Sequence, residues 1–268
     1  MSYVYPNIEL LKRQLESSEI TEKVIDEMQV KIQGIIDAHK VDASIVAHRK
    51  SPLNIIFDIQ KGTGVLKKDI AALSKNMEVE IGLPVTVFVD SSFHISVTHA
   101  NKEFVRTRTI FEGDADNKEP LDFAIGIDEN GKTAHIDLSD SPHLMISGST
   151  GTGKTVLVDD IIANIVFKAS PEEVKLMLID PVLADFKVYR DLPHLICPVL
   201  RNKGEITDAM KLIADEIDYR KNTINTRSLR EYNKKTKSKL PVIVVIIDKY
   251  SELTYEMPKE FLEYAKKI

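Results

Sequence analysis

The sequence predicts an α/β protein in which a layered domain of alternating strands and helices follows a smaller α+β section. Residues 144–146 form a short apolar run that leads through a glycine-rich loop into an apolar helical segment at 155–167. Residues 242–247 are all β-branched with no polar alternation, which is typical of a strand buried on both faces of a parallel sheet. Between them lie a strand pattern at 174–179 and a helical pattern at 206–224. Such alternation indicates a layered α/β domain.

The first section, residues 1–111, mixes helices and strands. Apolar side chains recur at helical spacing over 18–39, with Ser18 as the expected N-cap, and again between Leu66 and Met77. Strand-like runs, of which the last two read as a hairpin, lie at 43–48, 53–60, 85–89 and 93–98. We therefore expect an N-terminal α+β domain.

The predicted domain boundary is a linker at 112–121, which is acidic and rich in turn residues. The second domain, 122–268, opens with a hairpin pattern around Asn130 and Gly131, a strong two-residue turn signal.

Composition excludes several classes of protein. With 43% hydrophobic residues the chain can bury a real core, and no stretch is long and apolar enough for a transmembrane helix. Cys197 is the one cysteine, so no intrachain disulfide forms, which suits a reducing cytosol. The N-terminus lacks the basic and apolar regions of a signal peptide. We expect a cytoplasmic chain without a membrane segment.

Charge is unevenly distributed. The whole chain carries −5, yet residues 220–239 contain eight Lys or Arg and one Glu. This segment, called the basic island below, is either a polyanion contact or a solvated lysine-rich loop.

A phosphate-binding loop is the most specific motif. Its pattern is a glycine, four residues, and then Gly-Lys-Thr between a predicted strand and a predicted helix. Glycines let successive backbone N–H groups converge on phosphate oxygens, and the helix N-terminus adds unpaired donors. Lys154 is expected to reach the β- and γ-phosphates of ATP, and the Thr155 hydroxyl to ligate Mg²⁺. The cofactor-binding residues predicted are Gly148, Ser149, Thr150, Gly151, Thr152, Gly153, Lys154 and Thr155.

A second metal ligand is expected at Asp248. It ends the apolar run 242–247, where the aspartate that completes a P-loop magnesium site belongs. His143 and His194 have no metal-ligand spacing, so we interpret them as structural. The Gly62 and Gly64 pair lacks the third glycine and the lysine of a nucleotide loop and predicts a turn.

Several runs extend beyond a single motif, and with them the chain resembles the FtsK/SpoIIIE family of ATP-driven DNA translocases. The similar segments lie at 141–156, 178–181, 189–195, 216–220, 231–233 and 244–248, and the N-terminal section is similar to the family's α/β domain at 5–11 and 61–65. The resemblance implies a RecA-like motor in which Lys154 and Asp248 are catalytic. It also implies a homo-oligomeric ring that hydrolyses ATP and moves along double-stranded DNA, held by its phosphates without sequence preference.

The chain departs from the family pattern at three places. Lys249 stands where the family has the glutamate that polarises the attacking water, and Val182 replaces a lysine. Lysine has three donors and no acceptor, so metal binding by Asp248 can survive while hydrolysis fails. The third departure is that no strand pattern follows Asp248, whereas the family places a sensor strand there.

We therefore expect an incomplete motor, either a fragment or a reduced member. The strands at 144–146 and 242–247 would then pair directly, admit another segment, or leave an open slot that makes a truncated product marginally stable. The functional alternatives are a nucleotide-binding assembly or regulatory module with little hydrolysis, and a coupling protein of a conjugative element.

Overall fold

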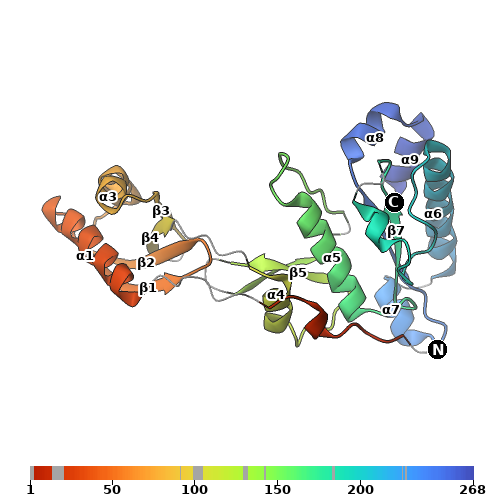
Figure 1. The fold of residues 1–268 in the computed structure, drawn as a ribbon, viewed down its shortest axis with the longest axis horizontal. Helices are drawn as coiled ribbons and strands as arrows, with labels where there is room; N and C mark the ends of the chain where they lie inside the picture. The colour runs from red at the N-terminus through yellow and green to blue at the C-terminus, as the bar shows by residue number, and fades with distance from the viewer. Residues whose placement is uncertain are drawn as a thin grey trace. The chain divides into compact units, whose positions relative to one another are not determined.

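The computed structural model describes residues 3–13, 21–90, 92–98, 105–128, 132–141, 143–182, 185–224, 226 and 228–268. The chain divides into two compact units. The sheet unit comprises residues 8–117 and 122–141, and the P-loop unit comprises residues 1–7, 118–121 and 142–268 (Figure 1).

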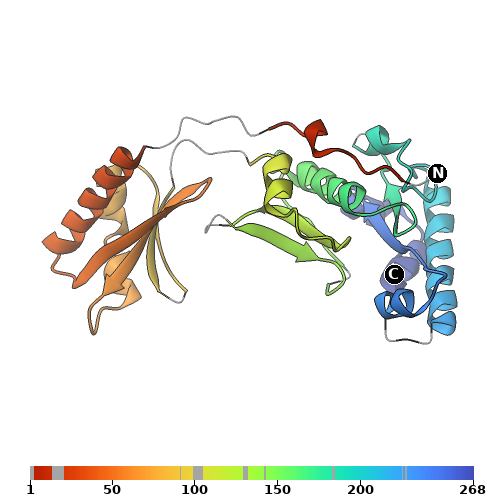
Figure 2. The ribbon, with the colours of Figure 1, turned by 90° about the horizontal axis from the view of Figure 1, so that it is seen from below.

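The sheet unit is built on four antiparallel strands in the order β1-β2-β4-β3. Their bounds are Ala43–Lys50 for β1, Asn54–Lys61 for β2, Val85–Val89 for β3 and Phe93–Thr98 for β4. Figure 2 shows α1 along one face of this sheet. The apolar side chains of that face form one core with three helices, α1 (Glu22–Ala38), α2 (Lys67–Ala71) and α3 (Ser74–Ile81).

Helix boundaries in this unit differ in detail from the sequence prediction. α1 begins after Thr21, whose backbone is extended, and Ser18 lies outside the described residues. The single helix expected between Leu66 and Met77 is two helices, because the chain leaves the helical hydrogen-bond pattern at 72–73. α3 ends at Gly82 with φ +79°, a left-handed conformation that glycine adopts without strain.

The predicted linker at 112–121 does not coincide with the boundary between the units. α4 (Thr107–Gly113) runs into it, and the hairpin of β5 (Asp122–Ile127) and β6 (Thr133–Asp137) belongs to the sheet unit. The physical reason is packing, because α4 lies against β5 and buries Ile110 and Phe111 while β5 buries Phe123. The predicted turn residues Asn130 and Gly131 lie outside the described residues.

Arg108 joins α4 to the short 3-10 helix η1 (Ile8–Leu10). Its guanidinium donates to both carboxylate oxygens of Glu9, at 2.7 and 3.0 Å, and to Glu112 at 2.8 Å. The side chain is buried, and this bidentate pairing is the geometry that lets an arginine leave solvent. These bonds raise the pKa of Arg108 above its already high ordinary value.

The P-loop unit contains two parallel strands, β7 (Val174–Ile179) and β8 (Val242–Ile247), at the predicted positions. Val174 pairs with Val242, and Ile179 with Ile247. The helices of this unit are α5 (Lys154–Lys168), the 3-10 helix η2 (Phe186–Tyr189), α6 (Lys203–Thr223), α7 (Leu229–Lys235), α8 (Tyr250–Glu256) and α9 (Lys259–Lys267).

The two strands are buried to different extents. β7 is covered on both faces, because Met177 and Ile179 pack in a core with α6, α8 and α9 while the alternate side chains are also buried. β8 was expected to be buried on both faces. Of its six side chains, however, Val244 is buried and the other five are half-buried. β7 has neighbours on both edges, since Leu176 and Ile179 also bridge to Leu195 and Leu200. Within the described chain, β8 is paired only with β7.

The predicted strand at 144–146 is wrong. These residues form no backbone ladder in the structure as described, and Leu144 and Met145 are 39% and 81% exposed. Three apolar residues make a strand only where a neighbouring strand accepts their backbone groups, and periodicity does not reveal that neighbour. Three arrangements were expected: direct pairing of 144–146 with β8, another segment between them, or an open slot. Within the described residues the second edge of β8 is unpaired, which corresponds to the open slot.

Candidate nucleotide site

The glycine-rich loop 148–155 is exposed and leads into the N-terminus of α5. Gly151 and Gly153 have φ of +80° and +93°, and Gly153 is the N-cap of α5. Gly148 is constrained differently, because a Cβ there would lie 2.7 Å from the Thr152 hydroxyl oxygen. The backbone thus needs glycine at these three positions for conformation or for close approach.

Lys154 closes the loop on itself. Its ammonium nitrogen donates to the carbonyl oxygens of Gly148 and Ser149, at 2.6 and 2.8 Å. The Thr152 hydroxyl donates to the Ser149 carbonyl oxygen at 2.7 Å. These bonds place a positive charge beside the first N–H groups of α5, whose N-terminus is itself partly positive. The loop therefore has the donor set that an anionic phosphate requires.

Asp248 follows β8 and has one unsatisfied carboxylate oxygen. Its backbone amide donates to the carbonyl oxygen of Ile179 at 2.9 Å, while its Oδ2 atom is buried and has no hydrogen-bond partner among the described residues. Burial raises the pKa of Asp248, and the nearby carboxylates of Asp185 and Asp180 raise it further. An orphaned carboxylate oxygen in an acidic surrounding fits a ligand for a hard cation such as Mg²⁺.

Lys249 has a left-handed backbone, with φ +53° and ψ +41°, and is the N-cap of α8. This conformation is uncommon for residues other than glycine. The positive charge of Lys249 lowers the pKa of Asp248 and so partly offsets the effect of burial.

Asp180 is a site residue whose role the sequence did not reveal. It is fully buried at the end of β7. Its carboxylate accepts hydrogen bonds from three backbone amides, those of Val182 at 3.2 Å, Asp185 at 3.0 Å and Phe186 at 3.1 Å. The sequence showed Asp180 only as part of a family-like run, and three acceptor contacts to later amides depend on how the following loop folds.

The predicted site residues fall into two groups. Residues 148–155 form one continuous loop at the start of α5, whereas Asp248 lies at the end of β8. No hydrogen bond or ion pair joins Asp248 to this loop in the part of the chain that the structure describes. Within the same part, no three His, Cys, Asp or Glu side chains cluster as a metal site. Thr155 and Asp248 are thus single candidate ligands.

The histidines interpreted as structural include one with an unsatisfied atom. His194 is fully buried, and its Nε2 donates to the Ala169 carbonyl oxygen at 2.9 Å. Its Nδ1 has no partner, and the Tyr3 ring lies edge-on to it at 5.1 Å between centroids. Burial lowers the pKa of His194, so the ring stays neutral. His143 is exposed.

The basic island is partly neutralised within the protein. Arg220 pairs with Glu216 at 2.7 Å, Arg230 with Glu119 and Lys235 with Glu231, each at 2.5 Å. Arg220 and Glu216 lie on α6, whereas Lys234, Lys235 and Glu231 lie on α7, and Lys237 and Lys239 follow α7 in the chain. Among the described residues of the island, Lys221, Lys234, Lys237 and Lys239 form no ion pair, so these four lysines carry the positive charge that remains for an external partner.

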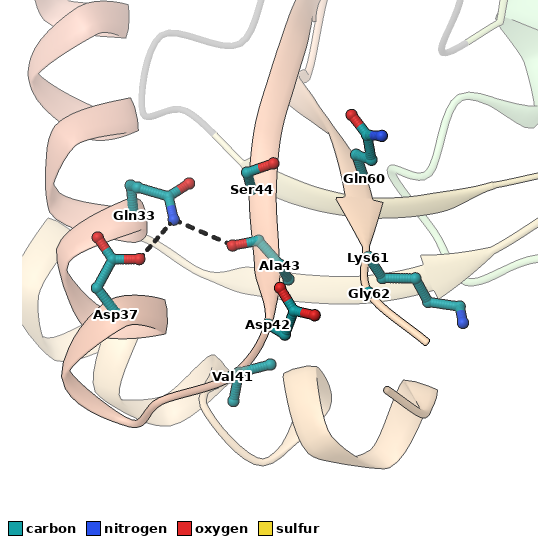
Figure 3. Close-up of a pocket in the computed structure, with 9 residues that line it drawn as sticks. All are labelled: Gln33, Asp37, Val41, Asp42, Ala43, Ser44, Gln60, Lys61 and Gly62. Carbon is teal, nitrogen blue, oxygen red and sulfur yellow. Dashed lines mark hydrogen bonds between the residues drawn. The ribbon is translucent and has the colours of Figure 1, made fainter. Parts of the chain in front are cut away.

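A separate polar cavity of about 480 Å³ lies in the sheet unit, beside the end of α1 (Figure 3). Gln33 lines this cavity, and its side-chain amide donates to the Asp37 carboxylate at 2.8 Å and to the Ala43 carbonyl oxygen at 3.1 Å. A Cβ at Gly62 would lie 1.7 Å from a carboxylate oxygen of Asp42, so a larger residue at this position requires the Asp42 side chain to move. The predicted turn at 62–64 is confirmed, with Gly64 at φ +93°.

Comparison with known proteins bears on the P-loop unit first. A profile of the FtsK/SpoIIIE family matches residues 112–239, which include the glycine-rich loop, β7 and the basic island. Full-length similarity to curated members extends the match to the sheet unit. The chain is similar to the FtsK/SpoIIIE family. The resemblance predicted from the sequence is confirmed.

Three relatives illustrate the similarity. DNA translocase FtsK of Caldanaerobacter subterraneus is 30% identical over 99% of this chain and 39% of its own length. DNA translocase FtsK of Borreliella burgdorferi is 29% identical over 93% of this chain and 34% of its own length. DNA translocase SftA of Bacillus subtilis is 29% identical over the whole chain and 30% of its own length. The chain thus spans about a third of the length of these relatives.

A solved structure of the pCW3 conjugation coupling protein TcpA with ATPγS is also similar, with a TM-score of 0.49 and 15% identity over 90% of this chain and 71% of that one. At this level the similarity does not bear on function. No described helix combines the length and apolar character that crossing a bilayer requires.

Proposed function

We propose that this chain binds Mg-ATP at the glycine-rich loop and couples its hydrolysis to movement along double-stranded DNA. The loop geometry is the observation that carries the proposal, because glycine conformations, a lysine ammonium and a helix N-terminus converge at one exposed point. Similarity to the FtsK/SpoIIIE family supports the second part, since curated relatives are named DNA translocases.

Each residue has a distinct role in this proposal. Backbone N–H groups of 148–153 cradle the phosphates, and Lys154 exchanges its loop carbonyls for phosphate oxygens. The Thr155 hydroxyl and the free oxygen of Asp248 are the protein's ligands for Mg²⁺. A bound Mg²⁺ supplies charge neutralisation of the β- and γ-phosphate oxygens.

DNA binding is proposed to be non-specific and carried by phosphate contacts. The lysines of the basic island that form no ion pair within the described part of the chain supply the positive charge. A cytoplasmic homo-oligomeric ring around the duplex completes the proposal, in keeping with the resemblance to the FtsK/SpoIIIE family.

A second candidate function is nucleotide binding with little turnover, which suits an assembly or regulatory module. Lys249 favours it, because an ammonium beside Asp248 cannot accept the proton of an attacking water.

A steady-state ATPase assay with and without duplex DNA separates the two. Turnover that DNA stimulates and that Lys154→Ala abolishes supports the motor. Binding of ATP without turnover, whether or not DNA is present, supports the second function. If calorimetry detects no Mg-ATP binding, both functions are wrong.

A further inference from the structure

Tyr189 connects the end of η2 to the helix that follows the glycine-rich loop. Its hydroxyl donates a hydrogen bond to the Asp159 carboxylate on α5 at 2.5 Å. The tyrosine side chain is half-buried, and burial is the main cause that raises its pKa, followed by the bond to Asp159. A short bond from a half-buried hydroxyl to a charged acceptor is stronger than an ordinary side-chain contact.

Asp159 has a particular position on α5. It lies four residues after Thr155, and residues at this spacing are neighbours on one face of a helix. The hydroxyl of Tyr189 thus binds α5 one helical turn after Thr155, the residue whose hydroxyl we assign to Mg²⁺.

The other end of this connection lies at the carboxyl ends of β7 and β8. The carboxylate of Asp180 accepts hydrogen bonds from the backbone amides of Asp185 and Phe186 at the start of η2, and the Phe186 side chain is buried. The carboxylates of Asp180 and Asp185 are also close enough to raise the pKa of Asp248. The hydrogen bonds from Asp185 and Phe186 to Asp180, together with the bond from Tyr189 to Asp159, therefore link the acidic surrounding of Asp248 to the Thr155 face of α5.

We infer that Tyr189 is a positioning residue for the Mg-nucleotide complex. Its bond to Asp159 fixes the Thr155 face of α5 relative to Asp248, so that the two proposed metal ligands act on one ion. This role rests on the proposed function, because it concerns the same site. It predicts that Tyr189 contributes to binding of Mg-ATP but not to binding of ATP freed of metal.

Calorimetry on the full chain tests this role, with ATP in Mg²⁺ and with ATP in EDTA. Tyr189→Phe should weaken Mg-ATP about fivefold, the lower end of typical coupling between sites, and leave metal-free ATP unchanged. Asp159→Ala should have the same effect, and the double variant should be no weaker than either single variant, because both remove one bond. Tyr219→Phe is the matched control, since Tyr219 is a 58% exposed tyrosine on α6.

The outcomes are distinguishable. Equal Mg-ATP affinity of the wild type and Tyr189→Phe overturns the positioning role while the proposed function stands. An equal loss with and without Mg²⁺ also overturns it, because a general distortion of α5 would act on both. Wild-type protein that binds no Mg-ATP overturns the proposed function and this inference together.

Discussion

Asp180 and Asp248 stand at the carboxyl ends of neighbouring parallel strands, directly after the register partners Ile179 and Ile247. The two carboxyl groups have opposite surroundings. That of Asp180 accepts three backbone amides, whereas that of Asp248 keeps one buried oxygen without a partner. Asp180 therefore organises the loop, and Asp248 has an oxygen free for a ligand.

Replacing Asp180 with Asn should destabilise the protein by about 2 kcal/mol, because an amide offers one acceptor oxygen where three N–H groups need acceptors. Chemical denaturation measures the change. Asp191→Asn is the control, since its side chain is 93% exposed and nearby in the chain. A stability equal to that of the control would show that the three amides find other acceptors.

Lys154→Ala should weaken Mg-ATP binding by at least about tenfold, because a charge-assisted contact to phosphate is lost. Isothermal titration calorimetry measures the affinity. Lys211→Ala, which removes an exposed lysine of α6, should leave it unchanged. Unchanged affinity in Lys154→Ala would falsify the assignment of the loop.

Hydrolysis by the wild-type chain should be slow, well below the enzyme median of about 10 per second, because Lys249 offers no acceptor for the proton of water. Lys249→Glu should raise turnover at least about tenfold, since a positioned base supplies a hundredfold or more in favourable cases. Lys249→Gln removes the charge without adding a base and is the control. Equal turnover of the Glu and Gln variants would show that the missing proton acceptor at position 249 is not the cause of slow hydrolysis.

Stability should fall in acid because His194 is buried as a neutral ring. Its pKa is lowered in the fold, so the unfolded chain binds more protons below the ordinary value of 6.5. The contribution of His194 to stability should be constant above about pH 7, and the melting temperature should decrease as pH falls from about 6.5 towards 5. His194→Gln keeps a donor for Ala169 and should flatten this part of the profile, whereas His143→Gln, at an exposed position, should not. The same dependence of melting temperature on pH in the wild type and both variants would contradict the assignment of this loss of stability to His194.

DNA binding should be sensitive to salt if the basic island contacts phosphates. Affinity for a duplex should fall on the order of a thousandfold between about 50 and 200 mM salt if several phosphates are contacted. Fluorescence anisotropy of labelled duplexes of unrelated sequence measures this. Binding and its salt dependence should be largely lost when glutamine replaces Lys234, Lys235, Lys237 and Lys239.

The control removes the same number of charges from exposed positions of the sheet unit, namely Lys23, Lys67, Lys68 and Lys75. Equal losses in the two sets would mean that net charge, and not the basic island, governs the binding.

The sequence by itself determined the elements whose signals are local. The glycine-rich loop, α5 and the strands β7 and β8 stand where spacing and side-chain type predicted them, because backbone conformation and periodicity are set by neighbouring residues. The same is true of the hairpin of β3 and β4. The resemblance to the FtsK/SpoIIIE family followed from the same motifs, and the comparisons confirm this resemblance.

Only the tertiary structure decided which elements meet. Within the described residues it paired 144–146 with no strand, and it placed the hairpin of β5 and β6 with the sheet unit. It also gave Asp180 its three amides and Tyr189 its bond to Asp159, across 30 positions of the chain. Partners this far apart in sequence depend on how strands and loops pack, and no local pattern of side chains records that packing.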